Sequence, residues 1–160
     1  MSKEPSDIGG SARPLTHLLD TDHLHFLLLG GGSEHDALVA RLAGGGVGWA
    51  VSVIGVQERL AGLFAMTNGR PPSPRVRLGY DLLRRSVRFF GAAPVLPFDD
   101  AAAAEFDRLD AAAKAVNRKP VPTLDLRVAA ITSAHGLTLL TRNAKDFARV
   151  PGLRFEDGTA

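Results

Sequence analysis

The sequence predicts an α/β fold in which helices cover both faces of a central parallel sheet. Two observations support this prediction. Short apolar segments alternate along the chain with longer segments of helical periodicity, which is typical of parallel sheets. The chain has 160 residues, of which 45% are hydrophobic and 22% are charged, so it can bury the core of one domain. In such a fold, functional sites form where the carboxyl ends of the strands meet.

The first predicted elements are a strand and two helices. Residues 15–19 are apolar enough for a short buried strand, and a helix follows that ends at the glycines of residues 30–32. Ser33 is predicted to cap a second helix, because two acids in the next turn favour the positive end of a helix dipole. The glycines of residues 44–46 end this helix.

The middle of the chain repeats the alternation of strand and helix. Residues 49–54 are apolar and β-branched enough for a buried strand, and residues 55–66 then show helical spacing. Three prolines within residues 71–74 are predicted to break the chain before a longer helix over residues 76–90.

The last third of the chain continues the same pattern. The segment APVLPFD (93–99) is another short predicted strand, after which Asp99 caps an alanine-rich helix. Thr123 is predicted to open and cap the next helix, which ends at Gly136. Residues 137–141 form a further strand, and the tail is predicted to hold a short helical turn and an edge strand.

The composition excludes several kinds of site. Because the chain has no cysteine, disulfides, thiolate metal sites and thiol nucleophiles are excluded, and a reducing compartment is the expected setting. The sequence shows neither an apolar leader nor a run of about 18 apolar residues, so we expect a cytoplasmic protein without a membrane span. We expect a flexible N-terminal segment (residues 1–14), a single domain (residues 15–157) and a C-terminal tail (residues 158–160).

Four acids are predicted to gather at the carboxyl rim of the sheet. Asp20 directly follows the first strand, Glu58 comes shortly after the second, and Asp146 follows the strand before the tail. Asp125 stands in the first turn of a helix, where the dipole favours its ionised form. Four carboxylates in one cleft repel one another, and a hard cation such as Mg²⁺ or Mn²⁺ would relieve the repulsion. Metal-dependent cleavage of a phosphodiester by a nuclease is the reaction that would use all four acids.

Each acid also has an ordinary structural explanation. Asp20 and Asp22 can cap a turn or a helix. Glu58 can be a solvated helix residue, Asp125 can interact with the helix dipole in a first turn, and Asp146 can belong to a surface loop. The joint placement of the four is what favours a site. Asp99 and Asp100 also follow a strand, which makes them candidate outer acids, but capping of the alanine-rich helix explains them equally well.

Arginines are concentrated between residues 69 and 90, which suits a polyanionic partner. Arg84, Arg85 and Arg88 are candidates for contact with an RNA backbone, although a solvated helix face explains them as well. Arg142 is nearer the acids, and we expect it to touch the scissile phosphate or to pair with one of the acids.

Two other motifs do not indicate a site. The glycines at 30–32 and 44–46 lack both the lysine of a P-loop and the spacing of a dinucleotide fingerprint. His23 and His25 are two residues apart and so point in different directions on a helix, and the sequence has no HExxH pattern. We therefore expect both histidines to be structural or surface residues rather than zinc ligands.

Four blocks of the sequence resemble PIN domains, most closely the VapC-type ribonuclease toxins of bacterial toxin–antitoxin pairs. The blocks are LLDTDHL (18–24), SVIGVQERLAGL (52–63), PTLDLRVAAITSAHGLTLLTRNAKDF (122–147) and VPGLRFED (150–157). The resemblance implies a three-layer α/β/α sandwich with a mainly parallel sheet and an endoribonuclease that depends on Mg²⁺, with Mn²⁺ as a substitute. It also implies a homodimer and a cognate antitoxin partner.

The resemblance assigns roles position by position. Asp20, Glu58, Asp125 and Asp146 correspond to the acids that bind the metal and carry catalysis. The predicted supporting residues around them are Thr21, Asp22, Thr123 and Asn143. Of these, Asp22 is expected to orient the turn or to hold a metal-bound water rather than to bind the ion directly.

The chain departs from the family pattern at Pro122, Gly55 and Gly158, where relatives often have glycine, threonine and tryptophan. Pro122 stiffens the loop before the third acid. These changes leave open a PIN-like scaffold that binds RNA or protein with little activity. A receiver-like signalling domain is a further alternative, but it leaves Glu58 and Asp125 without a role.

Overall fold

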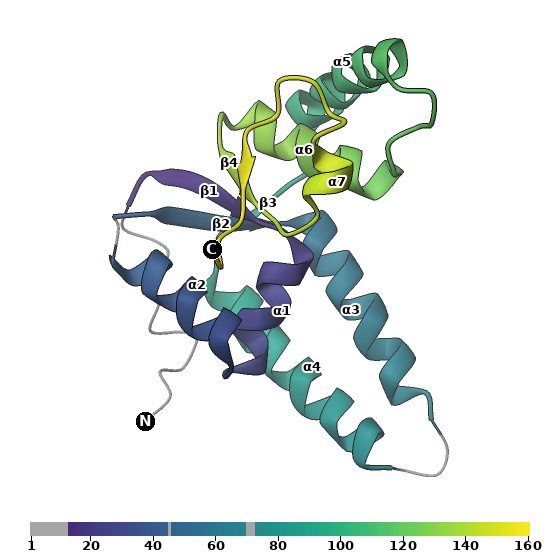
Figure 1. Cartoon of the computed structure of the whole chain (residues 1–160). Coiled ribbons are helices and arrows are strands. Elements are labelled where there is room, and N and C mark those ends of the chain that lie inside the picture. The colour runs from purple at the N-terminus through teal and green to yellow at the C-terminus, as the bar shows by residue number, and fades with distance from the viewer. Residues whose placement is uncertain (1–12, 45, 70–72) are drawn as a thin grey trace.

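A five-stranded sheet forms the centre of the molecule in the computed structural model, which describes residues 13–44, 46–69 and 73–160. All four strand pairs are parallel, and the order across the sheet is β3-β2-β1-β4-β5 (Figure 1). The strands are β1 (Leu15–Leu19), β2 (Gly48–Ser52), β3 (Val95–Leu96), β4 (Thr138–Leu140) and β5 (Phe155–Glu156). Of the expected flexible segment at residues 1–14, only the last two residues lie within the described ranges.

Seven helices are present in these ranges. They are α1 (Thr21–Leu29), α2 (Ser33–Gly44), α3 (Val53–Thr67), α4 (Pro74–Ala92), α5 (Asp100–Val116), α6 (Thr123–Ala134) and α7 (Ala144–Phe147). None of these helices combines the length and the apolar character that crossing a membrane requires.

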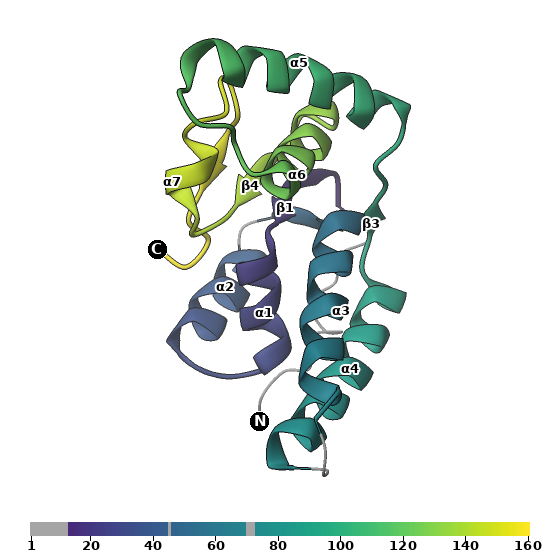
Figure 2. The same cartoon turned by 90° about the vertical axis from the view of Figure 1, so that its right-hand side faces the viewer.

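The helices form two layers around the sheet, which confirms the predicted α/β/α fold. Helices α5, α6 and α7 cover one face, and α1, α2 and α4 pack against the other (Figures 1 and 2). Alternation along the strands supplies both cores: in β1, Leu18 joins the first cluster and Leu19 the second. The second core includes Trp49, whose ring stacks on Phe89 at a centroid distance of 5.7 Å.

Two predicted boundaries in the middle of the chain are wrong, because capping side chains act earlier than the apolar pattern suggests. Strand β2 ends at Ser52 rather than at residue 54, since the Ser52 hydroxyl accepts a hydrogen bond from the Gly55 amide at 3.0 Å and starts α3. Pro74 does not precede α4 but begins it, with Ser73 as the capping residue. The strands predicted at 93–99 and 137–141 are shorter in the structure, where they are β3 and β4.

Three predicted caps have different outcomes. Asp99 caps α5 as predicted, because its carboxylate accepts a hydrogen bond from the Ala102 amide at 3.0 Å. Ser33 is instead the first residue of α2, and its hydroxyl donates to Glu34. Thr123 opens α6 as predicted but makes no capping hydrogen bond, since Pro122 occupies the cap position.

Two predicted helix stops are confirmed by the backbone. Gly30 follows α1 with φ of 74°, and Gly136 lies after α6 with φ of 64°. Both conformations are left-handed, which glycine adopts without steric cost.

The strand order creates a switch point beside β1. From β1 the chain proceeds to β2 and β3 on one side and then returns to β4 on the other. Open parallel sheets place their sites outside the carboxyl ends of the strands at such a point. The ends of β1 and β4 are therefore the expected location of a site.

Candidate active site

Asp20 lies at the carboxyl end of β1, where two strands and a helix meet. Its backbone amide donates to the Leu140 carbonyl at 3.0 Å, and its carbonyl accepts from the Leu24 amide as α1 begins. Its carboxylate accepts a hydrogen bond from the Thr141 hydroxyl at 2.7 Å. The position of Asp20 is thus determined by β1, by the end of β4 and by the first turn of α1.

The surroundings of Asp20 disfavour its negative charge. Burial raises the pKa of Asp20 to about 6, and the charges of Asp22 and Glu58 act in the same direction. Hydrogen bonds from Thr141 and from the Thr21 amide oppose this rise without cancelling it. Without a nearby cation, the ionised form of Asp20 is therefore costly.

Glu58 approaches the same point from α3. The Thr21 hydroxyl, in the first turn of α1, donates to the Glu58 carboxylate at 2.5 Å and ties the two helices together. The charge of Glu58 raises the pKa of both Asp20 and Asp125. Glu58 therefore lies within electrostatic reach of an acid on each side.

Asp125 and Asp146 are bridged by one amide group. The Asn143 side chain donates to the Asp125 carboxylate at 3.4 Å and to the Asp146 carboxylate at 3.2 Å. Burial raises the pKa of Asp125, and the charges of Asp146 and Glu58 raise it further, whereas the hydrogen bond from Asn143 lowers it. The structure thus brings together the four acids expected from the sequence, together with Thr21 and Asn143.

The Asp22 carboxylate accepts hydrogen bonds from residues other than these four acids. Its Oδ1 accepts from the His23 amide at 2.6 Å and from His23 Nδ1 at 2.7 Å, and its Oδ2 accepts from the Arg142 amide at 2.9 Å. Burial by itself would raise the pKa of Asp22, but these hydrogen bonds outweigh burial and hold the pKa below its ordinary value. Asp22 orients the turn after β1 and the loop after β4.

Thr141 is a central residue that the sequence analysis missed. It is 1% exposed, its hydroxyl donates to Asp20, and the same oxygen accepts from the Asn143 amide at 3.0 Å. Arg149 was also missed, and its guanidinium lies 3.4 Å from the Asp146 carboxylate. The one sequence signal that could have indicated Thr141 is the position of a threonine directly after an apolar strand.

Thr123 forms no hydrogen bond to the four acids among the described residues. It is exposed at the start of α6, and within the described ranges its side chain forms no hydrogen bond to any of them. No hydrogen bond among the described residues therefore supports the expected role of Thr123 beside the acids.

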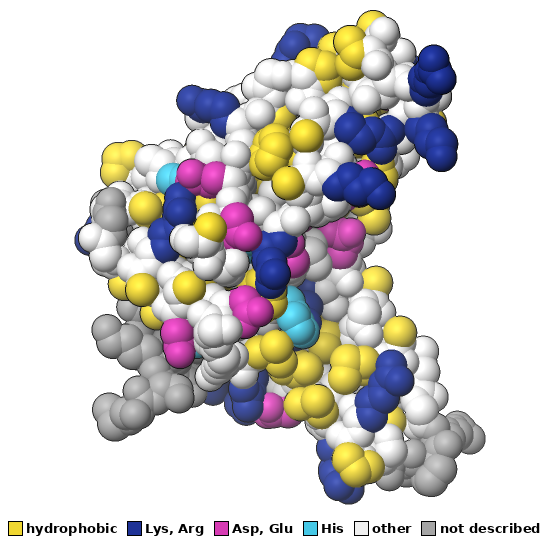
Figure 3. Space-filling model, viewed as in Figure 1, with side chains coloured by type: hydrophobic (Ala, Val, Ile, Leu, Met, Phe, Trp, Pro, Cys, Tyr) yellow, Lys and Arg dark blue, Asp and Glu magenta, His cyan; other side chains and the backbone are white. Residues whose placement is uncertain are grey.

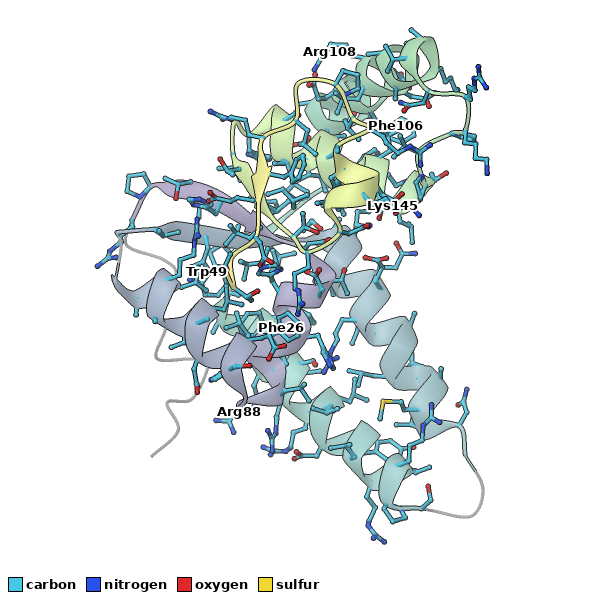
Figure 4. All side chains as sticks on the ribbon, viewed as in Figure 1. Phe26, Trp49, Arg88, Phe106, Arg108 and Lys145 are labelled. Carbon is cyan, nitrogen blue, oxygen red and sulfur yellow. The ribbon has the colours of Figure 1, made fainter. Side chains whose placement is uncertain are left out.

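The expectation that Arg142 pairs with one of the four acids is wrong. Its guanidinium lies 3.5 Å from the Glu34 carboxylate and 4.0 Å from that of Asp157, and it stands over the Phe26 ring at 5.5 Å. Phe26 and its surroundings are shown in Figure 4. The direction of the Arg142 side chain follows from its backbone, whose amide is bound to Asp22.

The arginines of α4 are partly neutralised. Arg84 and Arg85 form ion pairs with Asp81 at 3.0 and 2.8 Å, the spacing of one helical turn. Arg88 is exposed and lies far from Lys145, which adjoins Asp146 (Figure 4).

The donor set suits a hard divalent cation, although the side chains do not enclose one as they stand. Within the described ranges, no group of three or more His, Asp or Glu side chains is arranged to hold a metal ion. Thr21, Thr141 and Asn143 hold the carboxylates in their present orientations. However, buried acids with raised pKa values are a feature that a cation would relieve, and oxygen donors match Mg²⁺ or Mn²⁺. The chemistry of these oxygen donors therefore suits such an ion.

One side of the molecular surface is hollowed (Figure 3). Figure 3 shows acidic side chains at the waist of the molecule, where the outline narrows between the layer of α5 to α7 and the helices below. Lys and Arg side chains lie on the upper layer beside this hollow (Figure 3).

Comparison with known proteins identifies one family and several similar structures. A family model described as "PIN domain" matches residues 18–153. The VapBC-1 structure from nontypeable Haemophilus influenzae is 19% identical with a TM-score of 0.71, and the match covers 91% of this chain and 100% of that one. VapBC2 from Rickettsia felis, bound to a promoter DNA fragment, is 19% identical with a TM-score of 0.68 over 89% of this chain and 98% of that one.

A third similar structure is FitAcB from Neisseria gonorrhoeae, with 23% identity and a TM-score of 0.64 over 89% of this chain and 98% of that one. The search of curated proteins finds no match. The structural similarities support the fold, and the family model covers most of the chain.

Proposed function

The chain belongs to the PIN domain family, and from this premise we propose that it is a metal-dependent endoribonuclease and the toxin of a toxin–antitoxin pair. The observation that carries the proposal is the meeting of four acids at the switch point of the sheet, two of them with raised pKa values. Glu58 acts electrostatically on both Asp20 and Asp125, which also favours a nuclease over a receiver-like domain, because such a domain would use neither Glu58 nor Asp125.

The proposed reaction assigns a task to each acid. Asp20, Glu58, Asp125 and Asp146 would hold Mg²⁺, or Mn²⁺ in its place. When bound, such an ion activates a water and neutralises charge on the phosphodiester. Three neighbouring residues orient the carboxylates through the hydrogen bonds described above; they are Thr21, Thr141 and Asn143.

The central test is metal-dependent RNA cleavage. Purified protein, free of any antitoxin, is expected to cut unstructured RNA in Mg²⁺ or Mn²⁺ and to be inactive in EDTA. Activity should return when Mg²⁺ is added in excess of the chelator. Cleavage that persists in EDTA would contradict the mechanism, whereas Mn²⁺ binding without cleavage of any RNA would favour the scaffold alternative.

We propose that RNA approaches over a basic surface formed by Arg118, Lys119 and Lys145. All three are exposed, and none forms an ion pair with a described residue. Arg149 joins the two parts of this surface, since it donates to the carbonyls of Lys119 and Pro120 while it pairs with Asp146. Unpaired cations beside the acids suit the phosphates that flank a cleavage site.

Reversal of charge on this surface should weaken RNA binding. In the triple variant Arg118→Glu, Lys119→Glu, Lys145→Glu, we expect KM for RNA to rise about tenfold at low salt, with a shallower dependence of KM on salt because about three phosphate contacts are lost. The matched control is Arg84→Glu, Arg85→Glu, Arg88→Glu on α4. A larger effect in the control would assign RNA binding to α4, as the sequence alone suggested.

We also propose a cognate antitoxin, a homodimer and a cytoplasmic location. Several similar structures are VapBC or FitAB assemblies, and one is a toxin–antitoxin complex from Klebsiella pneumoniae. Exposed apolar side chains on α3 and α4 support a protein partner; they include Phe64, Leu78, Tyr80 and Val87.

A further inference from the structure

We propose that the C-terminal turn, Asp157 to Thr159, is a clasp that positions the acids through the buried His23. This inference rests on the proposed function, because it concerns the same metal site. His23 is a positioning residue in this proposal, since it touches none of the four acids itself. The structure supports each link between the clasp and the acids.

Both ring nitrogens of His23 are occupied by fixed partners. The side chain is 0% exposed, its Nε2 accepts a hydrogen bond from the Gly158 amide at 2.9 Å, and its Nδ1 lies 2.7 Å from Asp22 Oδ1. A carboxylate only accepts and a backbone amide only donates, so the ring carries its proton on Nδ1. His23 therefore connects the clasp to Asp22 in one defined orientation.

The clasp fits against His23 closely enough to require glycine. A Cβ atom at position 158 would lie 2.9 Å from two atoms of the His23 ring and 3.1 Å from a methyl group of Leu38. The turn is closed by Thr159, whose amide and hydroxyl both donate to Asp157 Oδ1 at 2.8 and 2.7 Å. Gly158 is thus required by space, and the turn that presents it is ordered by its own hydrogen bonds.

Asp22 passes this constraint to the loop after β4. Its second oxygen accepts from the Arg142 amide at 2.9 Å, and the Arg142 guanidinium returns to Asp157 at 4.0 Å. The loop is therefore attached to the clasp both through its backbone and through its side chain.

The residues on either side of Arg142 hold three of the four acids. Thr141 donates to Asp20, and Asn143 donates to both Asp125 and Asp146. A displacement of the Arg142 amide would consequently move the partners of all three acids. Glu58 alone is outside this network, because Thr21 holds it.

The test compares Gly158→Ala and His23→Ala with the double variant, and uses Gly91→Ala as the control. A Cβ at Gly91 meets no atom within 4 Å. For each single variant we expect Mn²⁺ affinity and kcat to fall about tenfold or more, the range seen for residues that orient metal ligands, with little change in KM for RNA. The double variant should be no worse than the poorer single variant, because both break the same link.

Backbone amide resonances provide a readout that does not depend on metal. The amides of Arg142 and Asn143 should shift in the metal-free variants but not in Gly91→Ala. If Gly158→Ala does not fold, Thr159→Val removes one hydrogen bond within the turn and should produce smaller shifts in the same amides.

The outcomes separate this proposal from the proposed function. Unchanged Arg142 amides, unchanged Mn²⁺ affinity with only a lower Tm, or additive losses in the double variant would overturn the clasp. If the wild-type protein binds no Mn²⁺ and cuts no RNA, the proposal of a metal-dependent nuclease is overturned. The clasp proposal then falls as well, even if the amide shifts show that Gly158 is linked to the loop after β4.

Discussion

Asp20→Asn is expected to abolish RNA cleavage and, at the same time, to stabilise the metal-free protein above pH 6. The loss of cleavage follows from the loss of a carboxylate that the proposed metal site needs, and should exceed a hundredfold. The gain in stability follows from the raised pKa of Asp20, because the amide keeps an oxygen that can accept from Thr141 but carries no charge.

The sign of the pH dependence follows from the two states. The pKa of Asp20 is about 6 in the folded protein and close to the ordinary aspartate value of 3.8 when unfolded, so the folded state binds the proton more tightly. The wild-type protein therefore loses stability as the pH rises from about 4 to about 6, by at most about 3 kcal/mol from this residue. The Asp20→Asn variant does not lose this stability, so the difference in free energy of unfolding between variant and wild type should grow over the same pH range.

Urea unfolding in EDTA at pH 4 and at pH 7.5 measures the effect. The free energies of unfolding of the two proteins should be similar at pH 4, and the variant should be the more stable by about 1–3 kcal/mol at pH 7.5. Asp107→Asn, an exposed acid on α5, is the matched control and should show no such dependence. A variant that is less stable at pH 7.5, or one that still cuts RNA, would contradict the role given to Asp20.

The fold was predictable where local chemistry marks an element. Gly30 and Gly136 end helices because they adopt left-handed backbone conformations, and Asp99 caps a helix with its carboxylate, so each can be recognised from neighbouring residues. The errors arose where two local signals compete. Apolar residues continue past Ser52, but its hydroxyl caps α3, and Pro74 both stops the preceding segment and begins α4.

The site was predictable only as far as strand ends indicate it. The rule that parallel strands meet at one rim is sufficient to place Asp20 with the other acids. It does not reveal Thr141 as the partner of Asp20, since that contact joins residues 121 positions apart. The contact between Gly158 and His23 spans 135 positions, and nothing near either residue in the sequence indicates it.

The arginines illustrate a signal that was present but not used. Arg84 and Arg85 follow Asp81 by three and four residues, the spacing at which side chains on a helix form ion pairs. That spacing already disfavoured them as free phosphate ligands. The basic surface combines Arg118 and Lys119, from the loop between α5 and α6, with Lys145 of α7, so its assembly required the structure.

Asn143→Leu is expected to reduce kcat/KM about 10- to 100-fold, with the larger loss at low pH. Leucine has nearly the same size but cannot donate to Asp125 and Asp146, which Asn143 bridges. The hydrogen bond from Asn143 lowers the pKa of Asp125 against burial and two neighbouring charges, so its removal raises that pKa. Protons then compete with the cation for Asp125 at a higher pH.

The acid limb of the pH profile for Mn²⁺ binding should therefore move to higher pH in Asn143→Leu. Titration with Mn²⁺ at pH 6 and at pH 8 measures this, and the loss of affinity relative to wild type should be greater at pH 6. Asn68→Leu, at the exposed end of α3, is the control and should leave both affinities unchanged. An equal loss at both pH values would mean that Asn143 orients the carboxylates without tuning their ionisation, and no loss at either would remove it from the site.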